Sequence, residues 1–352
     1  MNESEFGGPG KKMPLRHAKA LSLSLESFIQ VEPSSSEGRP PLVIRPAAGG
    51  IDLIAWAASA REFMEENLSK HGALLLRGFD IGDADRFERF IKAVSGELLE
   101  YNERSSPRSH VSGRIYTSTD YPEDQNIFLH NENSYQNMWP MRIYFFCLTP
   151  PASGGETPIA DCRGIISRIN AKIRDRFLRK QVMYVRNYMY GIGLDWRTVF
   201  QTTEQRVVER HCRRAGIEFE WKDGGHLRTR AVRPAIVKHP HTNETVWFNH
   251  ATFFHISTLA PGIREALLGA FKEEDLPTNS YYGDGSPIEA GVLDDLRDIY
   301  RQETVRFPWK RGDILMLDNM LWAHGRAAFV GPRQILVGMS NPYSRVEGHV
   351  LA

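Results

Sequence analysis

Apolar residues recur every three or four positions between Asp52 and Gly72, which predicts a helix over that span. The unbroken apolar run that begins at Ala73 and exits at Gly78-Phe79 then predicts a short buried strand. Phenylalanine and aliphatic residues at helical spacing over 87–94 predict a second helix. The ordered part of the chain is therefore expected to open as helix, strand and helix.

Helical periodicity is lost after Glu100, where short β-prone runs alternate with turn residues. The segments predicted as strands are 142–148, 227–259, 312–319 and 334–339. The segments predicted as helices are 161–180, 203–215, 261–273 and 287–302. Closely spaced strands with Gly and Pro turns favour a sandwich or barrel. The fold class expected is therefore mainly β with surrounding helices, an α+β protein.

The first part of the chain has a different character. Residues 1–41 are polar and rich in Gly, Pro and Ser, which predicts a flexible N-terminal lead-in. From residue 42 to residue 352 we find no internal repeat and no clear linker. A single domain over 42–352 is the simpler interpretation.

Overall composition excludes several classes of protein. The 352 residues are 41% hydrophobic and 25% charged with a net charge of +1, so bulk charge gives no case for binding nucleic acid or an acidic membrane surface. Three cysteines without a C-x-x-C motif argue against a disulfide framework and a zinc-thiolate site. We see no secretory signal and no apolar run of membrane-spanning length. The expected location is the cytoplasm.

One short motif carries candidate chemistry. His130 and Glu132 form the only His-x-Asp/Glu pair among the twelve histidines of the chain. In an extended segment, side chains two positions apart point to the same side, so His130 and Glu132 could bind one metal ion. Together with the distant His324 they would make the two-histidine, one-carboxylate triad of non-haem Fe(II) oxygenases. The alternative is a chance pair that forms a surface hydrogen bond.

The motifs around this pair resemble a known family in order and spacing. They are Gly72–Phe79, Asn126 with His130 and Glu132, Gly154–Thr157, Gly312-Asp313 leading to Asp318-Asn319 and His324, and Arg333. This arrangement resembles the TauD/TfdA family of Fe(II)- and 2-oxoglutarate-dependent dioxygenases over about residues 42 to 345. The resemblance implies a double-stranded β-helix, or jelly-roll, core. It also implies Fe(II) bound by His130, Glu132 and His324.

The resemblance further implies that Thr157 and Arg333 contact 2-oxoglutarate. An arginine fork suits the distal carboxylate of this cosubstrate. Arg326, two residues after His324, is the alternative anchor, or it forms a salt bridge at a loop. Asn126 is expected either to face the substrate or to cap a strand end. Related halogenases have a small residue where this chain has Glu132, so hydroxylation or desaturation, with O2 as the oxidant, is favoured over halogenation.

A subgroup likeness bears on the substrate. Residues 184–196 and 221–229 resemble family members found beside non-ribosomal peptide pathways, which hydroxylate amino acids, free or tethered to a carrier protein. Arg228, Arg230 and Arg233 are candidates for holding a carboxylate or phosphate, and otherwise form a solvated strand face. The predicted function is hydroxylation of an amino-acid-like substrate in antibiotic biosynthesis. The alternatives are a desaturase or cyclase of this family, or an inactive jelly-roll binding protein.

Overall fold

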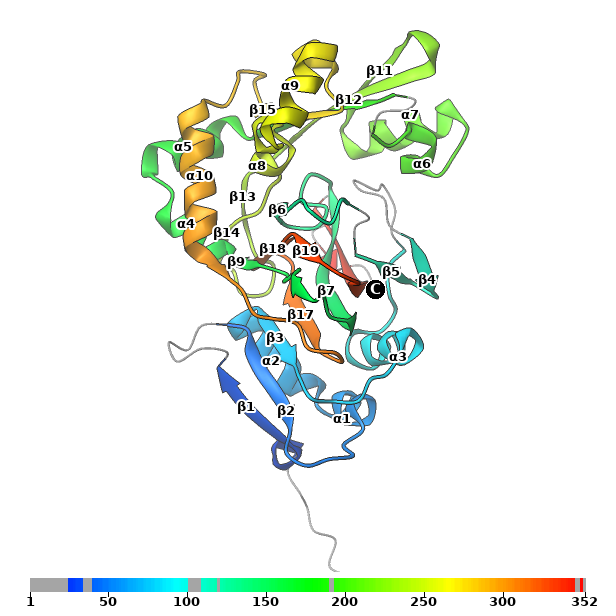
Figure 1. Ribbon diagram of the computed structural model, residues 1–352. Helices are drawn as coiled ribbons and strands as arrows, with labels where there is room; N and C mark the ends of the chain where they lie inside the picture. The colour runs from blue at the N-terminus through cyan, green and yellow to red at the C-terminus, as the bar shows by residue number, and fades with distance from the viewer. Residues whose placement is uncertain are drawn as a thin grey trace, which may run out of the picture.

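The computed structural model describes residues 25–33, 40–100, 109–118, 121–189, 193–345 and 349–350 (Figure 1). Its largest sheet has nine strands in the order β1-β2-β3-β17-β7-β20-β5-β4, with β21 paired to β20. These strands are β1 Ile29–Pro33, β2 Leu42–Pro46, β3 Ala73–Leu76, β17 Ile314–Asp318, β7 Met138–Thr149, β20 Gln334–Ser344, β5 Ile115–Thr117, β4 His110–Ser112 and β21 His349–Val350.

A second sheet faces the first and completes the jelly-roll core. Its order is β16-β9-β18-β6, and its strands are β16 Thr304–Val305, β9 Ile159–Asp161, β18 Trp322–Arg326 and β6 Ile127–His130. A short pair, β8 Ser153–Gly154 with β19 Phe329–Val330, lies beside it. One apolar cluster contains residues of both sheets, including Leu129 and Ile159 from one and Phe145 from the other. The jelly-roll core expected from the sequence is therefore confirmed.

Alternating side chains of the central strands serve two different cores. On β7, Ile143 and Phe145 face the inter-sheet cluster, whereas Tyr144 and Phe146 face the opposite side. That opposite side is covered by three helices, α1 Leu53–Ser59, α2 Arg61–His71 and α3 Ala84–Ser95. Both faces of β7 are thus buried, which explains its continuous apolar sequence.

The remaining elements surround this core (Figure 1). A four-stranded sheet has the order β11-β12-β10-β15. Its strands are β11 Glu218–Lys222, β12 His226–Arg233, β10 Val182–Tyr188 and β15 Thr278–Tyr282, and β13 Ile236–Lys238 pairs with β14 Thr245–Trp247. The further helices are α4 Cys162–Arg168, α5 Ala171–Lys180, α6 Trp196–Phe200, α7 Gln205–Ala215, α8 Ala251–Phe254, α9 Pro261–Ala270 and α10 Ala290–Glu303. Single 3-10 turns are η1 Leu25–Phe28, η2 Asp223–Gly225, η3 Ile256–Thr258 and η4 Glu273–Asp275.

Three sequence predictions need correction. The helix expected over 52–72 is two helices that meet at Ala60, and the apolar period hides this break because both helices face the same core. The region 227–259, expected as strands, contains the helix α8. Within the expected lead-in, Ile29–Pro33 is an edge strand paired antiparallel with β2, so part of residues 1–41 belongs to the fold. Residues 1–24 and 34–39 lie outside the described residues.

A membrane-spanning helix is not found in the described part of the chain, where every helix is too short or too polar to cross a bilayer.

A buried ion pair ties the large sheet together. Arg77, just after β3, donates from Nε and Nη2 to the Asp313 carboxylate at 3.0 and 2.6 Å, and Asp313 precedes β17. The Asp313 side chain is fully buried and that of Arg77 is 11% exposed. Asp313 also accepts a hydrogen bond from the Lys310 backbone N–H. The pair therefore fixes the start of the strand that leads to the candidate site.

We expect Arg77→Met to lower the free energy of unfolding by about 3–5 kcal/mol, because it leaves the Asp313 charge buried without its partner. Urea unfolding followed by tryptophan fluorescence measures this loss. Arg45→Met is the control, since the Arg45–Glu32 pair is exposed and should contribute under about 1 kcal/mol. Equal losses in the two variants would contradict the expectation.

Candidate active site

Strand pairing brings the two candidate histidines face to face. In the antiparallel pair of β6 and β18, His324 lies directly opposite His130, and their ring centroids are 4.7 Å apart. The two strands approach closely at Gly325, where an added Cβ would lie 2.6 Å from the Ile127 carbonyl oxygen. Glycine at this position therefore permits the close pairing that holds the imidazoles together.

Glu132 lies near the two histidines because the chain turns after β6. Strand β6 ends at His130, two residues before Glu132, and Asn133 adopts a left-handed conformation with φ of 57°. The extended geometry expected from the sequence therefore does not continue to Glu132. The Glu132 Oε2 atom still lies 3.9 Å from His324 Nε2. One donor atom from each of His130, Glu132 and His324 lies within 4.8 Å of the others.

A buried asparagine fixes the backbone of this turn. The Glu132 N–H donates to Asn319 Oδ1 at 2.8 Å, while Asn319 Nδ2 donates to the carbonyl oxygens of Glu132 and Pro140 at 2.9 and 2.8 Å. Asn131 Nδ2 donates in turn to the Asn319 carbonyl oxygen at 2.7 Å. The turn that carries the candidate carboxylate is thus clamped to the turn that follows β17.

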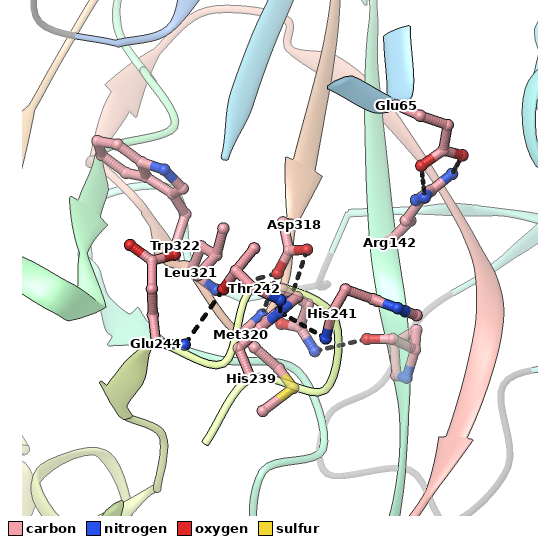
Figure 2. Close-up of polar contacts among 12 residues, drawn as sticks. Glu65, Arg142, His239, His241, Thr242, Glu244, Asp318, Met320, Leu321 and Trp322 are labelled. Atoms are coloured by element: carbon pink, nitrogen blue, oxygen red, sulfur yellow. Dashed lines mark hydrogen bonds and ion pairs between the residues drawn. The ribbon is translucent and has the colours of Figure 1, made fainter. Parts of the chain in front are cut away.

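Asp318, the residue before Asn319, stabilises the turn that follows β17 (Figure 2). Asp318 Oδ1 accepts from the backbone N–H groups of Met320 and Leu321, and Oδ2 accepts from His239 Nε2 at 3.0 Å. His239 Nδ1 accepts from the N–H groups of His241 and Thr242, which fixes the neutral tautomer. No pattern in the sequence shows this link, because His239 and Asp318 are 79 residues apart in the chain.

Neighbouring groups orient the first histidine. His130 Nδ1 lies 2.9 Å from the Phe128 carbonyl oxygen, an acceptor that requires a proton on Nδ1 and leaves Nε2 as the candidate metal ligand. Phe253 stacks on the His130 ring at 4.4 Å, and His250 lies 5.7 Å away. Burial, together with the nearby His130 and Arg186, holds the pKa of His250 well below its ordinary value. A neutral His250 adds no competing charge beside the ligands.

The donor set fits the iron that the sequence implied. Two imidazoles and one carboxylate, with Glu132 and His324 buried, are the facial triad that Fe(II) oxygenases use. Three ligands on one side leave open positions for other ligands. The residues present therefore match Fe(II) in number, in donor type and in convergence.

A narrow cavity next to the two histidines contains the predicted cosubstrate residues. It is lined by Ser118, Ile127, His130, Phe145, Thr157, His324, Gly325, Arg326, Arg333 and Val337. Arg333 donates from Nε to the Gly155 carbonyl oxygen at 2.9 Å and from Nη1 to Ser118 Oγ at 3.1 Å. Burial, and then the charge of Arg326, lowers the pKa of Arg333 to about 10. A carboxylate entering this cavity would meet a desolvated guanidinium.

Thr157 and the glycines beside it complete this cavity. Thr157 Oγ1 accepts from Trp309 Nε1 at 3.2 Å, so its own hydroxyl hydrogen remains available to donate. Gly155 has a positive φ of 68°, and an added Cβ would lie 2.7 Å from Pro151 Cγ and 3.0 Å from Arg333 Cδ. Glycine there lets the backbone bend around the arginine and offer it a carbonyl.

Arg326 and Asn126, the other two residues that the sequence analysis singled out, bond to backbone groups of the protein. Arg326 donates to the backbone carbonyl oxygens of Tyr121, Pro122 and Gln125, so it holds the loop over 121–125 rather than pairing with an acid. Asn126 Oδ1 accepts from the Ala328 N–H at 2.8 Å. Asn126 therefore caps a backbone group, and it also lines the larger cavity described next.

The larger cavity has a volume of about 510 Å³ and reaches His130. Its described lining is Tyr121, Asp124, Gln125, Asn126, Ile127, Phe128, His130, Phe253, Phe254, Thr258, Leu259, Ala260 and Thr278. This described lining is aromatic and polar, with one carboxylate, Asp124, and neither Lys nor Arg. It offers room for a substrate beside the candidate iron ligands.

The three strand arginines differ from one another. Arg228 pairs with Asp275 and lies 3.8 Å from Glu220, and Arg230 also lies 3.8 Å from Glu220. Arg233 donates to the carbonyl oxygens of Ala215 and Val232. None of the three lines the cavity at His130. Of the Tyr/Gly/Trp-rich segment 184–196, Tyr190–Ile192 lies outside the described residues.

Asn319→Ala should weaken Fe(II) binding about 10- to 100-fold, because it removes the clamp on the Glu132 backbone without touching a ligand. Anaerobic equilibrium titration with Fe(II) measures the change. Asn170→Ala is the control, since Asn170 caps α5 through the Lys172 N–H. An unchanged affinity in Asn319→Ala, with the fold intact, would exclude this role.

Comparisons with known proteins point to the same family as the sequence motifs. The model of the family described as "Taurine catabolism dioxygenase TauD, TfdA family" matches residues 36–340. The dapdiamide synthesis protein DdaC of Enterobacter agglomerans is 38% identical over 310 residues, which covers 85% of this chain and 94% of that protein. The clavaminate synthase-like protein At3g21360 of Arabidopsis thaliana is 30% identical over 323 residues, covering 86% and 94%.

Solved structures share the fold at lower identity. PvcB from Pseudomonas aeruginosa superposes with a TM-score of 0.54 at 15% identity, covering 91% of this chain and 93% of that one. A taurine dioxygenase from Burkholderia xenovorans gives a TM-score of 0.53 at 16% identity, covering 92% and 93%. With its converging histidines and carboxylate, this chain belongs to the TauD/TfdA family of Fe(II)- and 2-oxoglutarate-dependent dioxygenases.

Proposed function

We propose that the protein hydroxylates an unactivated C–H bond of an amino-acid-like, carrier-bound substrate in the biosynthesis of a peptide-like antibiotic. His130, Glu132 and His324 would hold Fe(II), and Thr157 and Arg333 would hold 2-oxoglutarate. The observation that carries the chemistry is the convergence of the three donor atoms within 4.8 Å beside a cavity that contains a buried arginine. The similarity to a dapdiamide synthesis protein supports the biosynthetic setting.

Bound Fe(II) with 2-oxoglutarate supplies the O2-dependent oxidation, in which substrate, O2 and 2-oxoglutarate become hydroxylated substrate, succinate and CO2. The protein residues provide position. Arg333 and Thr157 would bind the distal carboxylate by charge-assisted hydrogen bonds. Phe253, stacked on His130, and Phe145, 5.1 Å from His324, exclude water from the ligands. Asn319 holds the Glu132 backbone, so the carboxylate keeps its direction.

Arg333 is the better anchor for 2-oxoglutarate. Among the described residues, its Nη1 bonds a serine hydroxyl in the narrow cavity, whereas both terminal nitrogens of Arg326 bond to backbone carbonyl oxygens of one loop. A carboxylate would satisfy Arg333 without disturbing other contacts. The same carboxylate could reach the Arg326 fork only by releasing residues 121–125.

The charge of the larger cavity favours a tethered substrate over a free amino acid. A free carboxylate would meet no Lys or Arg in the described lining and would lie near Asp124. A thioester or amide carries no such charge, and its amino group would complement Asp124. Asn126, at the same wall, is positioned to contact the substrate through the amide nitrogen that its contact with Ala328 leaves available.

The cosubstrate assignment predicts a weak visible charge-transfer band when Fe(II) and 2-oxoglutarate are added without oxygen. Arg333→Gln should raise the 2-oxoglutarate concentration needed for half of the band about tenfold or more. Arg326→Gln should leave that concentration within about threefold and lower thermal stability instead. Glu132→Ala should abolish the band. No band in the wild type would instead favour an inactive jelly-roll binding protein.

The substrate assignment predicts that N-acetylcysteamine thioesters of amino acids stimulate succinate formation more than the matched free acids. Asp124→Asn should reduce this stimulation, while Glu123→Gln, a change at the exposed neighbour outside the cavity lining, should not. Product mass distinguishes hydroxylation from desaturation or cyclisation. Stimulation by simple sulfonates or aryloxyacetates alone would exclude an amino-acid-like substrate, and stimulation by free acids alone would exclude the tethered form.

A further inference from the structure

The connection over residues 326–329, from the end of β18 to the start of β19, contacts the backbone beside the cosubstrate cavity. The Gly155 N–H donates to the Ala328 carbonyl oxygen at 2.9 Å. The Gly155 carbonyl oxygen accepts from Arg333 Nε, also at 2.9 Å. An added Cβ at Gly154 would overlap the Ala328 carbonyl oxygen, so the two backbones are in close contact. The connection is therefore packed against the residues that hold Arg333.

The same connection also holds residues 121–126, which form part of the wall of the larger cavity. Both terminal nitrogens of Arg326 donate to carbonyl oxygens of residues 121–125. The Phe329 N–H donates to the Glu123 carbonyl oxygen at 2.9 Å. The residues of this segment that line the larger cavity are Tyr121, Asp124, Gln125 and Asn126. The position of this wall therefore depends on the Arg326 fork.

The Arg326 side chain belongs to the cosubstrate cavity as well. Arg326 is buried and lines that cavity together with Arg333. The two guanidinium groups lie over one ring, that of Phe329, at 5.2 Å for Arg326 and 5.4 Å for Arg333. The Nε atom of Arg326 is buried and has no hydrogen-bond partner among the described residues. One arginine thus contacts the wall of the larger cavity and also faces the space proposed for 2-oxoglutarate.

The two positive charges in this narrow cavity repel each other. Burial, and then the charge of Arg326, lowers the pKa of Arg333 to about 10, whereas the Glu156 carboxylate acts in the opposite direction and more weakly. Glu123 attracts Arg326, but at Arg333 the repulsion from Arg326 outweighs the attraction of the nearby acid. An anion bound to Arg333 would offset this repulsion. It would therefore favour the arrangement in which Arg326 lies beside Arg333.

We propose that Arg326 is a positioning residue that couples the two cavities. An anion bound at Arg333, here 2-oxoglutarate, stabilises Arg326 beside it, and the Arg326 fork in turn fixes residues 121–126. Without the anion, repulsion between the two arginines favours release of this segment. By reciprocity, a substrate that fixes the segment also tightens the binding of 2-oxoglutarate. The inference rests on the proposed function in that 2-oxoglutarate binds at Arg333, and it does not depend on the identity of the substrate.

Hydrogen exchange followed by mass spectrometry tests this coupling in the full chain without a substrate. The N–H groups to follow are those of Gln125, Ala328 and Phe329, whose acceptors lie within residues 121–126. The Fe(II)-loaded protein is compared anaerobically without 2-oxoglutarate and at a concentration that saturates the charge-transfer band. We expect the cosubstrate to slow exchange of these groups about fivefold or more in the wild type. In Arg326→Gln the band should still form, and exchange should be equally fast with and without the cosubstrate.

Two further variants complete the experiment. Arg61→Gln is the matched control, because Arg61 Nε also donates to a backbone carbonyl oxygen, that of Ala93, but lies outside the described lining of both cavities. It should keep the slowing seen in the wild type. Arg326→Lys is the second variant should glutamine disturb the fold. Lysine retains the positive charge beside Arg333 but lacks the planar fork, so most of the slowing should be lost.

The outcomes separate this inference from the proposed function. If the wild type forms no band, the proposed function fails, and the inference fails with it. If the band forms but exchange is not slowed, or is slowed equally in Arg326→Gln and Arg326→Lys, only the coupling is overturned. Slowing that extends equally to α3, outside both cavity linings, would show a general stabilisation and would also overturn the coupling.

Discussion

The pairing of β6 with β18 is the constraint on which the candidate site depends. These strands place His324 opposite His130 across one antiparallel register, and no local sequence feature could bring two residues so distant in the chain to this separation. The glycine at 325 allows the strands to approach, and the Asn319 clamp supplies the third ligand from a turn. Metal binding in this protein is thus a property of sheet geometry more than of any single motif.

The buried arginines of this fold differ in the groups that their guanidinium groups contact. Arg77 has a carboxylate partner and stabilises the sheet. Arg326 is satisfied by backbone carbonyl oxygens and shapes a loop. Arg333 donates to the Gly155 carbonyl oxygen and the Ser118 hydroxyl within a cavity, and burial, followed by the charge of Arg326, lowers its pKa. The same side chain is therefore structural or available for a ligand according to what surrounds its guanidinium.

Apolar alternation along the chain predicted a β-rich sandwich or barrel, and the resemblance in the order and spacing of motifs implied the jelly-roll core and the triad residues. The sequence did not predict the break at Ala60, since both helices keep one apolar face toward the same core. It also missed β1, a short edge strand next to polar residues, and the roles of Asn319 and His239, which depend on contacts across 187 and 79 residues. The sequence grouped Arg228, Arg230 and Arg233 together, because no pattern shows which strand arginines have acids nearby.

The Asn319 clamp has a consequence for the order of folding. Its partners Glu132 and Pro140 lie 187 and 179 residues earlier in the chain, so the ligand turn can be fixed only after the sequence-distant strands have paired. Closing such long loops is costly in chain entropy and comes late in the folding of β-rich proteins. A partly folded chain would therefore lack the complete ligand set. Redox-active iron would then be held firmly only by molecules whose barrel has closed.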